Sequence, residues 1–282
     1  MGQNSTIEWT KNTANLWWGC TKVHEGCDHC YAETLAKRWG NNVWGNDSPR
    51  RQITSFWSDL NKYQKAAKKS GTIDRVFVGS MMDIFEKPMP LVDKDGNLLQ
   101  GTTADLRLRF FANITAGMYP NLMFLFLTKR PSNINKYIPE VWKDAPPKNV
   151  MFGTSPCNQL TAEILIPQLL QVNGSKFLSV EPQLAEITLL PWLINRQIDW
   201  VIQGGESGRG KRKFETDWAR KLKVECEATG IPYFFKQIDK VQEIPDDLLI
   251  REYPEDVFSE GLKVACNGCI KAKREAGGGF QI

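Results

Sequence analysis

The stretch LMFLFLTKR, residues 122–130, joins an apolar run to the polar cluster Thr128-Lys129-Arg130. A short run that is apolar almost throughout is typical of a parallel strand buried on both faces of its sheet. The polar residues come directly after the run, where such a strand gives way to a loop. The stretch therefore predicts a buried strand that ends in polar and charged side chains, which could bind a ligand.

The same arrangement recurs along the chain, because short apolar runs alternate with longer amphipathic stretches. We expect strands at residues 14–18, 75–80, 122–128, 149–154, 176–180, 199–204 and 232–236. We expect helices at residues 31–39, 56–69, 104–118, 162–171 and 214–229. Strands that alternate with helices form a parallel sheet with right-handed crossovers. A barrel and a doubly wound sheet both fit this alternation.

Polar or glycine-containing clusters follow nearly every expected strand, and they favour the barrel, whose active sites are built at the C-terminal ends of the strands. We predict an α/β protein with a partial or full TIM-like (β/α)6-7 barrel of parallel strands. The barrel is expected to span residues 1–240, including an N-terminal cysteine loop, and residues 241–282 to form a C-terminal extension. The clusters are Ser80-Met81-Met82-Asp83, Thr128-Lys129-Arg130, Thr154-Ser155, Ser179-Val180-Glu181, Gly204-Gly205-Glu206-Ser207 and Lys236-Gln237.

Composition limits the class of protein. The 282 residues are 41% hydrophobic and carry a net charge of +4, which permits a polyanionic partner without requiring one. No apolar run approaches the roughly 18 residues of a membrane span, and the polar N-terminus lacks the apolar core of a signal peptide. We therefore expect no membrane association and a cytoplasmic location, in a bacterium or a phage-infected host cell.

Three cysteines near the start, Cys20, Cys27 and Cys30, form a C-x6-C-x2-C cluster. Cytosolic thiols stay reduced, so these cysteines are candidate metal ligands. Soft thiolates select zinc or iron–sulfur clusters, and a structural zinc site normally takes four ligands. Three thiolates leave one position open for another ligand. A Cys3His zinc site closed by His24, an iron–sulfur cluster and unligated cysteines all remain open at this point.

The cysteine cluster resembles that of the radical S-adenosylmethionine (SAM) superfamily. Members carry three cysteines after the first barrel strand, usually as C-x3-C-x2-C, and these hold a 4Fe-4S cluster whose fourth iron binds SAM. The first gap here has six residues instead of three, a spacing of outlying members. The resemblance implies that Cys20, Cys27 and Cys30 are the metal ligands, with a 4Fe-4S cluster and SAM as cofactors.

Further segments carry the resemblance beyond the cysteines. The segment V-G-S-M-M-D, residues 78–83, is similar to the second-strand motif of the spore photoproduct lyase branch, and Thr128-Lys129-Arg130 resembles its T-K segment. The segments I-E-W-T, G-C-D-H-C-Y-A-E, S-V-E-P and G-G-E-S-G look like a family of unassigned function common in phages and prophages. That likeness covers roughly residues 6–240.

The two ends of SAM suggest roles for the strand-end residues. Asp83 or Glu206 is a candidate acceptor for the SAM ammonium group. Lys129 or Arg130 is a candidate partner for its carboxylate.

The remaining candidates surround these residues. Gly205, like Gly204, would let the backbone approach a ligand closely. His29 lies either near the SAM adenine or on the surface as a cap of the following helix. Cys157 is a candidate hydrogen-atom donor to a substrate radical, as spore photoproduct lyase uses a cysteine; the alternative is an inert buried thiol. The candidates for ribose or substrate binding are Ser80, Ser155 and Glu181.

The resulting prediction is a radical SAM enzyme. A reduced cluster, supplied with electrons by a flavodoxin- or ferredoxin-type donor, would cleave SAM to methionine and a 5′-deoxyadenosyl radical. A nucleotide or nucleic-acid base is the candidate substrate, for modification or repair, and the lyase, isomerase or transferase subtype stays open. One alternative is a zinc-stabilised, non-catalytic nucleic-acid-binding or host-interaction module. Another is a hydrolase with Glu181 and Glu206 as paired carboxylates.

A second C-x2-C pair, Cys266 and Cys269, lies near the end of the chain. Two thiols alone supply half of a zinc or cluster ligand set. The pair is either part of an auxiliary metal site or a turn in the tail.

Overall fold

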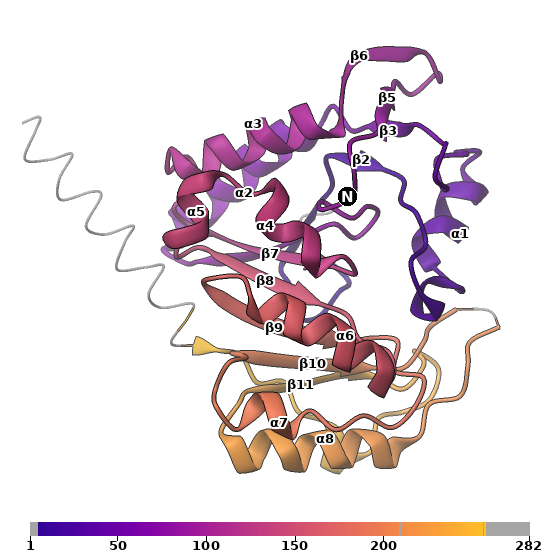
Figure 1. The fold of residues 1–282 in the computed structure, drawn as a ribbon, viewed down its shortest axis with the longest axis vertical. Coiled ribbons are helices and arrows are strands. Elements are labelled where there is room, and N and C mark those ends of the chain that lie inside the picture. Colours follow the sequence, from indigo (N-terminus) through magenta and orange to yellow (C-terminus); the bar gives the residue numbers. More distant parts are fainter. Residues whose placement is uncertain (1–4, 209, 256, 258–282) are drawn as a thin grey trace, which may run out of the picture.

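The structure is a computed structural model that describes residues 5–208, 210–255 and 257. Its centre is a seven-stranded sheet in which every neighbouring pair is parallel. In spatial order the strands are β1 (Asn12–Ala14), β4 (Asp74–Val78), β7 (Leu122–Thr128), β8 (Val150–Thr154), β9 (Ser175–Val180), β10 (Trp200–Gly204) and β11 (Tyr233–Gln237). The sheet curls into a half-barrel with β1 and β11 at its edges (Figure 1), which confirms the predicted partial barrel.

The helices expected between the strands are present. They are α1 (Tyr31–Arg38), α2 (Phe56–Ser70), α3 (Thr103–Thr115), α6 (Gln159–Leu170) and α8 (Thr216–Thr229). Shorter helices complete the crossovers: α4 (Ile134–Tyr137), α5 (Glu140–Asp144) and α7 (Leu190–Leu193). Helix α8 ends at Gly230, whose φ of 66° is the left-handed conformation expected of a C-terminal glycine. Figure 1 shows α1 set apart from the other helices. Within the described residues, no helix has the length and apolar character that a membrane crossing requires.

Apolar side chains cover both faces of the sheet. Successive residues of a strand point to opposite faces. In β7, Phe124 and Phe126 join the core beneath the helices, whereas Met123 and Leu125 face the concave side. The N-terminal segment closes that concave side with Trp9, whose ring centroid lies 6.2 Å from that of Trp200. This two-sided burial is the physical reason that LMFLFL is apolar throughout.

The expected strand at residues 14–18 is wrong, because the run divides between two sheets. Strand β1 ends at Ala14, and β2 (Trp17–Trp18) belongs to a second sheet. Asn15 makes the break: its side-chain amide is buried, donates to Ser80 Oγ at 2.8 Å and accepts from the Met81 amide at 2.7 Å. Long-range hydrogen bonds therefore end β1 inside an apolar run.

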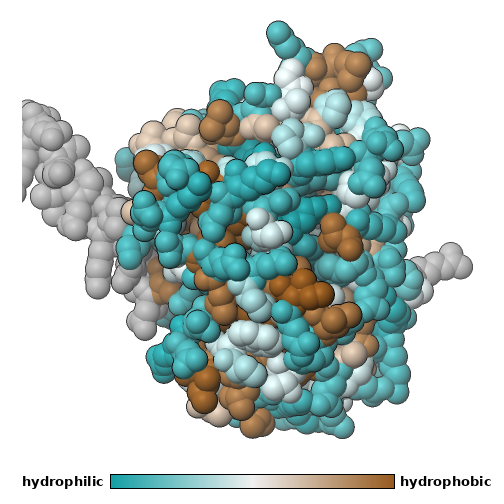
Figure 2. All heavy atoms as spheres, viewed as in Figure 1, coloured by the Kyte–Doolittle hydropathy of each residue, from teal (hydrophilic) through white to brown (hydrophobic). Residues whose placement is uncertain are grey.

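The second sheet has the order β2-β3-β5-β6, with β3 (Arg50–Gln52), β5 (Pro90–Val92) and β6 (Leu98–Thr102). Its strands are short and partly polar. They show no regular alternation of apolar and polar residues from which the sequence could predict them. Figure 2 shows a mostly hydrophilic face with a small hydrophobic group where β5 and β6 project. Leu98 on β6 is 76% exposed, in keeping with that projection.

The described part of the expected C-terminal extension packs against the barrel. Arg251 forms an antiparallel bridge with Phe234 on β11, and Trp200 Nε1 donates to the Glu252 carbonyl at 2.9 Å. The 3-10 helix η3 (Asp246–Leu248) precedes these contacts. Cys266 and Cys269 lie outside the described residues.

Candidate functional site

The C-terminal ends of the strands meet at a pocket of about 750 Å³. All three cysteines of the N-terminal motif line this pocket together with side chains from six strand ends. These strand-end residues are Ser80, Met81, Met82, Asp83, Lys129, Arg130, Ser155, Ser179, Glu181, Glu206, Ser207 and Lys236. The fold thus brings the cysteine loop and most of the predicted site residues into one cavity, as in α/β-barrel active sites.

Gly19 fixes the point at which the cysteine loop begins. Its φ is 123°, and a Cβ there would lie 2.3 Å from the Val43 carbonyl oxygen. Its amide donates to the Met81 carbonyl at 3.1 Å. Only glycine adopts this conformation and tolerates this approach without strain. Cys20 is therefore held beside the end of β4.

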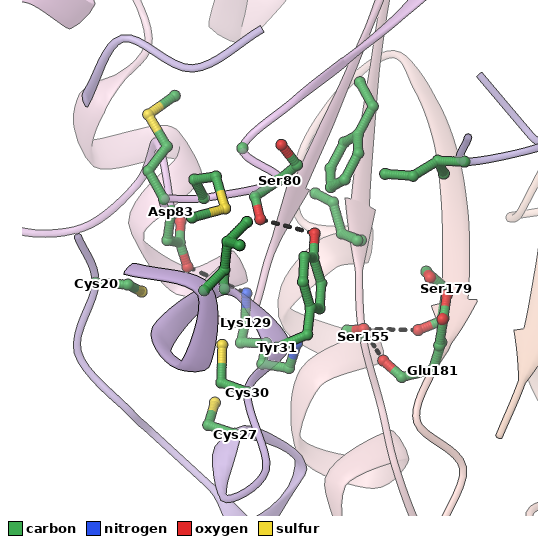
Figure 3. A pocket seen from close by; sticks show the side chains of 18 of the residues that line it. Cys20, Cys27, Cys30, Tyr31, Ser80, Asp83, Lys129, Ser155, Ser179 and Glu181 are labelled. Atoms are coloured by element: carbon green, nitrogen blue, oxygen red, sulfur yellow. Dashed lines mark hydrogen bonds between the residues drawn. The ribbon is translucent and has the colours of Figure 1, made fainter. Parts of the chain in front are cut away.

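The other two cysteines follow a short 3-10 turn, η1 (Glu25–Cys27). His24 caps the turn, because its Nδ1 accepts from the Gly26 amide at 3.1 Å. Cys30 is the residue immediately before α1. In Figure 3 the side chains of Cys27 and Cys30 lie next to each other, and Cys20 approaches from the opposite part of the loop. The turn accommodates part of the six-residue gap in the motif.

The three thiols of the motif line the pocket and are soft sulfur donors. Cys20, Cys27 and Cys30 are free and partly exposed. In the described part of the chain, no group of three or more His, Cys, Asp or Glu side chains is arranged around the position of one metal ion. Thiolates bind zinc ions and iron–sulfur clusters, and the geometry of these three does not choose between them.

Arg130 links the first cysteine to the strand ends. It donates to Asp83 Oδ2 at 2.8 Å, and the same Nη1 lies 3.8 Å from Cys20 Sγ. Its Nη2 donates to the Thr21 carbonyl. Burial, with the Asp83 carboxylate adding to it, raises the pKa of the partly exposed Cys20 to about 12, and Arg130 opposes this rise. The guanidinium therefore supports the negative form of this thiol.

Asp83 itself is saturated by protein contacts. Its carboxylate accepts from Thr128 Oγ1 at 2.8 and 2.9 Å, from the Phe85 amide at 2.9 Å and from Arg130. The side chain is buried, with the residue 5% exposed. These contacts fit a carboxylate that organises the ends of β4 and β7 better than one that binds a ligand ammonium.

A second guanidinium, that of Arg50, stabilises the segments next to the cysteine loop. Arg50 is fully buried and forms a two-pronged ion pair with Glu86, at 2.6 and 2.9 Å. It also donates to the carbonyls of Val43 and Gly45 and to Thr21 Oγ1. Charge and hydrogen bonds thus fix the segments on both sides of the cysteine loop.

Lys129 is a cation of the pocket that remains available, as is Lys240. Among the described residues its ammonium group has no hydrogen-bond or ion-pair partner, whereas neighbouring Arg130 is engaged by Asp83. In Figure 3 Lys129 lies beside the cysteines and below Asp83. An anionic group of a ligand would therefore find its charge partner at Lys129.

Tyr31 lines the pocket as well. Its hydroxyl donates to the Ser80 carbonyl at 2.8 Å, and Figure 3 shows the ring crossing the pocket. Ser80 Oγ, in turn, accepts from Asn15. The position of Tyr31 directly after the cysteine motif was the available signal, because α1 begins at the pocket.

Ser155 and Glu181 meet at the ends of β8 and β9. Ser155 Oγ donates to the carbonyls of Ser179 at 2.7 Å and Glu181 at 3.1 Å (Figure 3). The Glu181 carboxylate forms an ion pair with Lys236 of β11. Both side chains line the pocket, but Ser155 Oγ and Glu181 Oε1 are already engaged.

Glu206 and His29 form a bridge between β10 and the cysteine loop. Glu206 Oε2 lies 2.9 Å from His29 Nδ1, and Arg212 donates to Oε1 at 2.6 Å. Burial alone would raise the pKa of Glu206, but the hydrogen bonds from Arg212 and His29 outweigh it, and the pKa is lowered. Glu206 is therefore ionised and paired, and with Glu181 also paired, neither carboxyl is set up as the acid of a hydrolase.

Cys157 lies behind the cysteine loop. Its side chain is fully buried, 3.7 Å from His24 Nδ1, and neither residue is among the described residues that line the pocket. Burial raises the pKa of Cys157 and lowers that of His24 to about 4. The placement gives no support to Cys157 as a hydrogen-atom donor or to His24 as a zinc ligand.

Gly205 also serves the fold. Its amide donates to the Gln237 carbonyl at 3.0 Å, and a Cβ would lie 2.0 Å from the Ile238 carbonyl oxygen. The glycine lets the ends of β10 and β11 approach each other, which is a structural reason for it independent of any ligand.

The fold and the site together define an α/β half-barrel protein with a cysteine-lined pocket at the C-terminal end of its sheet. Within that class the chain belongs to the DUF5131 family, described as a protein of unknown function, whose match covers residues 4–250. The match includes the whole sheet and the complete pocket. No curated protein and no solved structure matches the chain.

Proposed function

We propose that the protein is a radical SAM enzyme in which Cys20, Cys27 and Cys30 hold a 4Fe-4S cluster. The observation that carries this proposal is that the three thiols line one pocket with the polar ends of the parallel strands. Three cysteines from one loop leave one iron of a cluster for a ligand, and the pocket is the space in front of them. When bound, the reduced cluster and SAM supply the radical chemistry.

The residues of the chain have separate tasks in this proposal. Lys129, whose ammonium group has no partner among the described residues, pairs with the carboxylate of SAM. Asp83 and Arg130 orient the ends of β4 and β7 and the Cys20 loop. Tyr31 and the apolar lining exclude water from the reacting atoms. Electrons come from a flavodoxin- or ferredoxin-type donor, and the substrate is a nucleotide or nucleic-acid base in the cytoplasm.

Anaerobic reconstitution with iron and sulfide tests the cluster. We expect brown protein with about four irons per chain and broad visible absorption. Cys27→Ala should lose the iron and the colour, whereas Cys226→Ala, at a buried thiol in α8, should keep both. Protein that binds zinc tightly and never incorporates iron would support the zinc-stabilised module instead.

Incubation of the reduced, reconstituted protein with SAM tests the reaction. Release of 5′-deoxyadenosine and methionine is the expected result, and its loss in Cys27→Ala ties the reaction to the cluster. Iron-loaded, reduced protein that leaves SAM intact would rule out radical SAM chemistry. Nucleoside mass spectrometry of DNA, RNA and nucleotides after the reaction then identifies the modified base.

A further inference from the structure

One end of the pocket is aromatic. Trp18, Trp39 and Trp44 line it together with Leu35 and Ala32, and we name these five residues the tryptophan annex. Trp39 directly follows α1 and is 63% exposed, although its ring centroid lies 5.6 Å from that of the buried Trp18. One side of Trp39 is thus supported by protein, while most of the residue faces solvent. A supported, exposed indole is a suitable platform for stacking by a planar ring.

Two arginines without acidic partners adjoin the annex, Arg51 against Trp18 and Arg38 directly before Trp39 in the chain. The Arg51 Cζ atom lies 4.4 Å from the centre of the Trp18 ring, and its Nη1 donates to Asn41 Oδ1. Arg38, in the last turn of α1, is exposed. No carboxylate of a described residue forms an ion pair with either arginine. The nearby carboxylate of Glu33 is occupied by Lys22 and Lys37.

The tryptophans and the two arginines would contact different parts of a ligand. The tryptophans line the pocket, whereas Arg38 and Arg51 are not among its described lining residues. An aromatic ring would enter the pocket, and anionic groups would remain at the rim. SAM has an adenine but no phosphate. An adenine of SAM at the annex would stack on the tryptophans but would leave both guanidinium groups unpaired. A strand of nucleic acid has a planar base for the annex and phosphates for the rim.

We propose that the tryptophan annex binds single-stranded nucleic acid, with one base stacked on Trp39 and the flanking phosphates paired with Arg38 and Arg51. This inference rests on the proposed function for the reaction and names its substrate class. A base in a duplex is stacked on its neighbours, so a single strand presents the base at lower free-energy cost.

Fluorescence anisotropy with labelled single strands of DNA and RNA, about ten nucleotides long, tests the site on the full chain without SAM. Trp39→Ala should weaken binding roughly tenfold or more, the loss typical of one stacked base. Trp39→Phe should keep most of the affinity, because a smaller ring still stacks. Trp39 is exposed, so both variants should keep the wild-type melting temperature.

The arginines are tested by the salt dependence of the same binding. Arg38→Gln and Arg51→Gln should each lower the slope of log K against log salt by about one phosphate contact. Arg109→Gln is the matched control, because Arg109 Cζ lies 4.4 Å from the centre of the Trp57 ring and neither residue lines the pocket. It should change neither the affinity nor the slope.

Two results would overturn the inference. One is equal affinity of wild type and Trp39→Ala for single strands. The other is binding of free mononucleotides in a Trp39-dependent way without binding of strands, which would place a small nucleotide at the annex. Failure of SAM cleavage with Trp39-dependent strand binding would count against the proposed function alone. Active SAM cleavage with Trp39-independent binding would count against this inference alone.

Discussion

Arg130 and Asp83 form a 2.8 Å ion pair at the mouth of the half-barrel, and the guanidinium that makes it also reaches the cysteine loop. Their side chains are 13% and 7% exposed, so water screens the pair little. Through this contact the end of β4, the end of β7 and the position of Cys20 depend on one another.

The first prediction concerns this pair. Asp83→Asn should lower the free energy of unfolding by about 3 kcal/mol, because it leaves the Arg130 charge without its partner in a mostly buried place. Urea denaturation measures the change. Asp95→Asn is the control, since its pair with Lys94 is exposed to solvent and should contribute far less to stability. Equal losses in the two variants would contradict the role given to Asp83.

The second prediction concerns Arg50 and Glu86. Glu86→Leu should destabilise the protein by about 3 to 5 kcal/mol, because it leaves the fully buried guanidinium of Arg50 without its charge partner. The double variant Arg50→Met with Glu86→Leu should be more stable than the sum of the two single losses predicts, with a coupling of about 1 to 3 kcal/mol. Strict additivity in a double-mutant cycle would show that the pair acts as two independent residues.

The third prediction concerns Lys129. Lys129→Gln should leave the unfolding midpoint unchanged, because no described residue pairs with its ammonium group. It should weaken SAM binding to the reconstituted protein by about tenfold, the value of one charge-assisted hydrogen bond. Titration calorimetry measures the affinity, and Lys94→Gln on the β5–β6 projection is the control. Unaltered SAM affinity in Lys129→Gln would remove this residue from the site.

The fourth prediction is a pH dependence of stability. Burial, followed by the nearby Lys129, lowers the pKa of His24 from 6.5 to about 4. Between these values the unfolded chain binds more protons than the folded chain, so stability rises with pH. The contribution of His24 is fully present above about pH 6.5 and is lost as the pH falls toward 4.

Unfolding free energies measured across this interval check the dependence. His24→Asn should flatten the slope, since asparagine can still accept from the Gly26 amide without titrating in this range. A wild-type slope in His24→Asn would assign the pH dependence to other groups.

The sequence by itself determined the regular part of the fold. Residues 122–128 are apolar throughout because both faces of β7 are buried, and such a pattern is local. The helical spacing of α8 and its terminal Gly230 are local as well. The sequence also located the three cysteines beside the strand ends, because the C-terminal ends of parallel strands share one edge of the sheet.

Only the tertiary structure decided which polar groups remain available. Asp83, Glu181 and Glu206 are all carboxylates at strand ends, and each is engaged by a cation. The partners of Asp83 and Glu181 come from distant segments, whereas Arg212 lies in the loop that follows Glu206. Lys129 and Arg130 are adjacent in sequence, but only the Arg130 side chain forms an ion pair among the described residues.

The same reason explains the elements that the sequence pattern missed. Asn15 divides an apolar run because it bonds with residues 80 and 81, 65 and 66 positions away. Cys157 is withdrawn from the pocket by its packing against His24, 133 positions away. Apolar periodicity is set by neighbours along the chain, whereas the partner of a polar side chain is set by distant residues that only folding brings near.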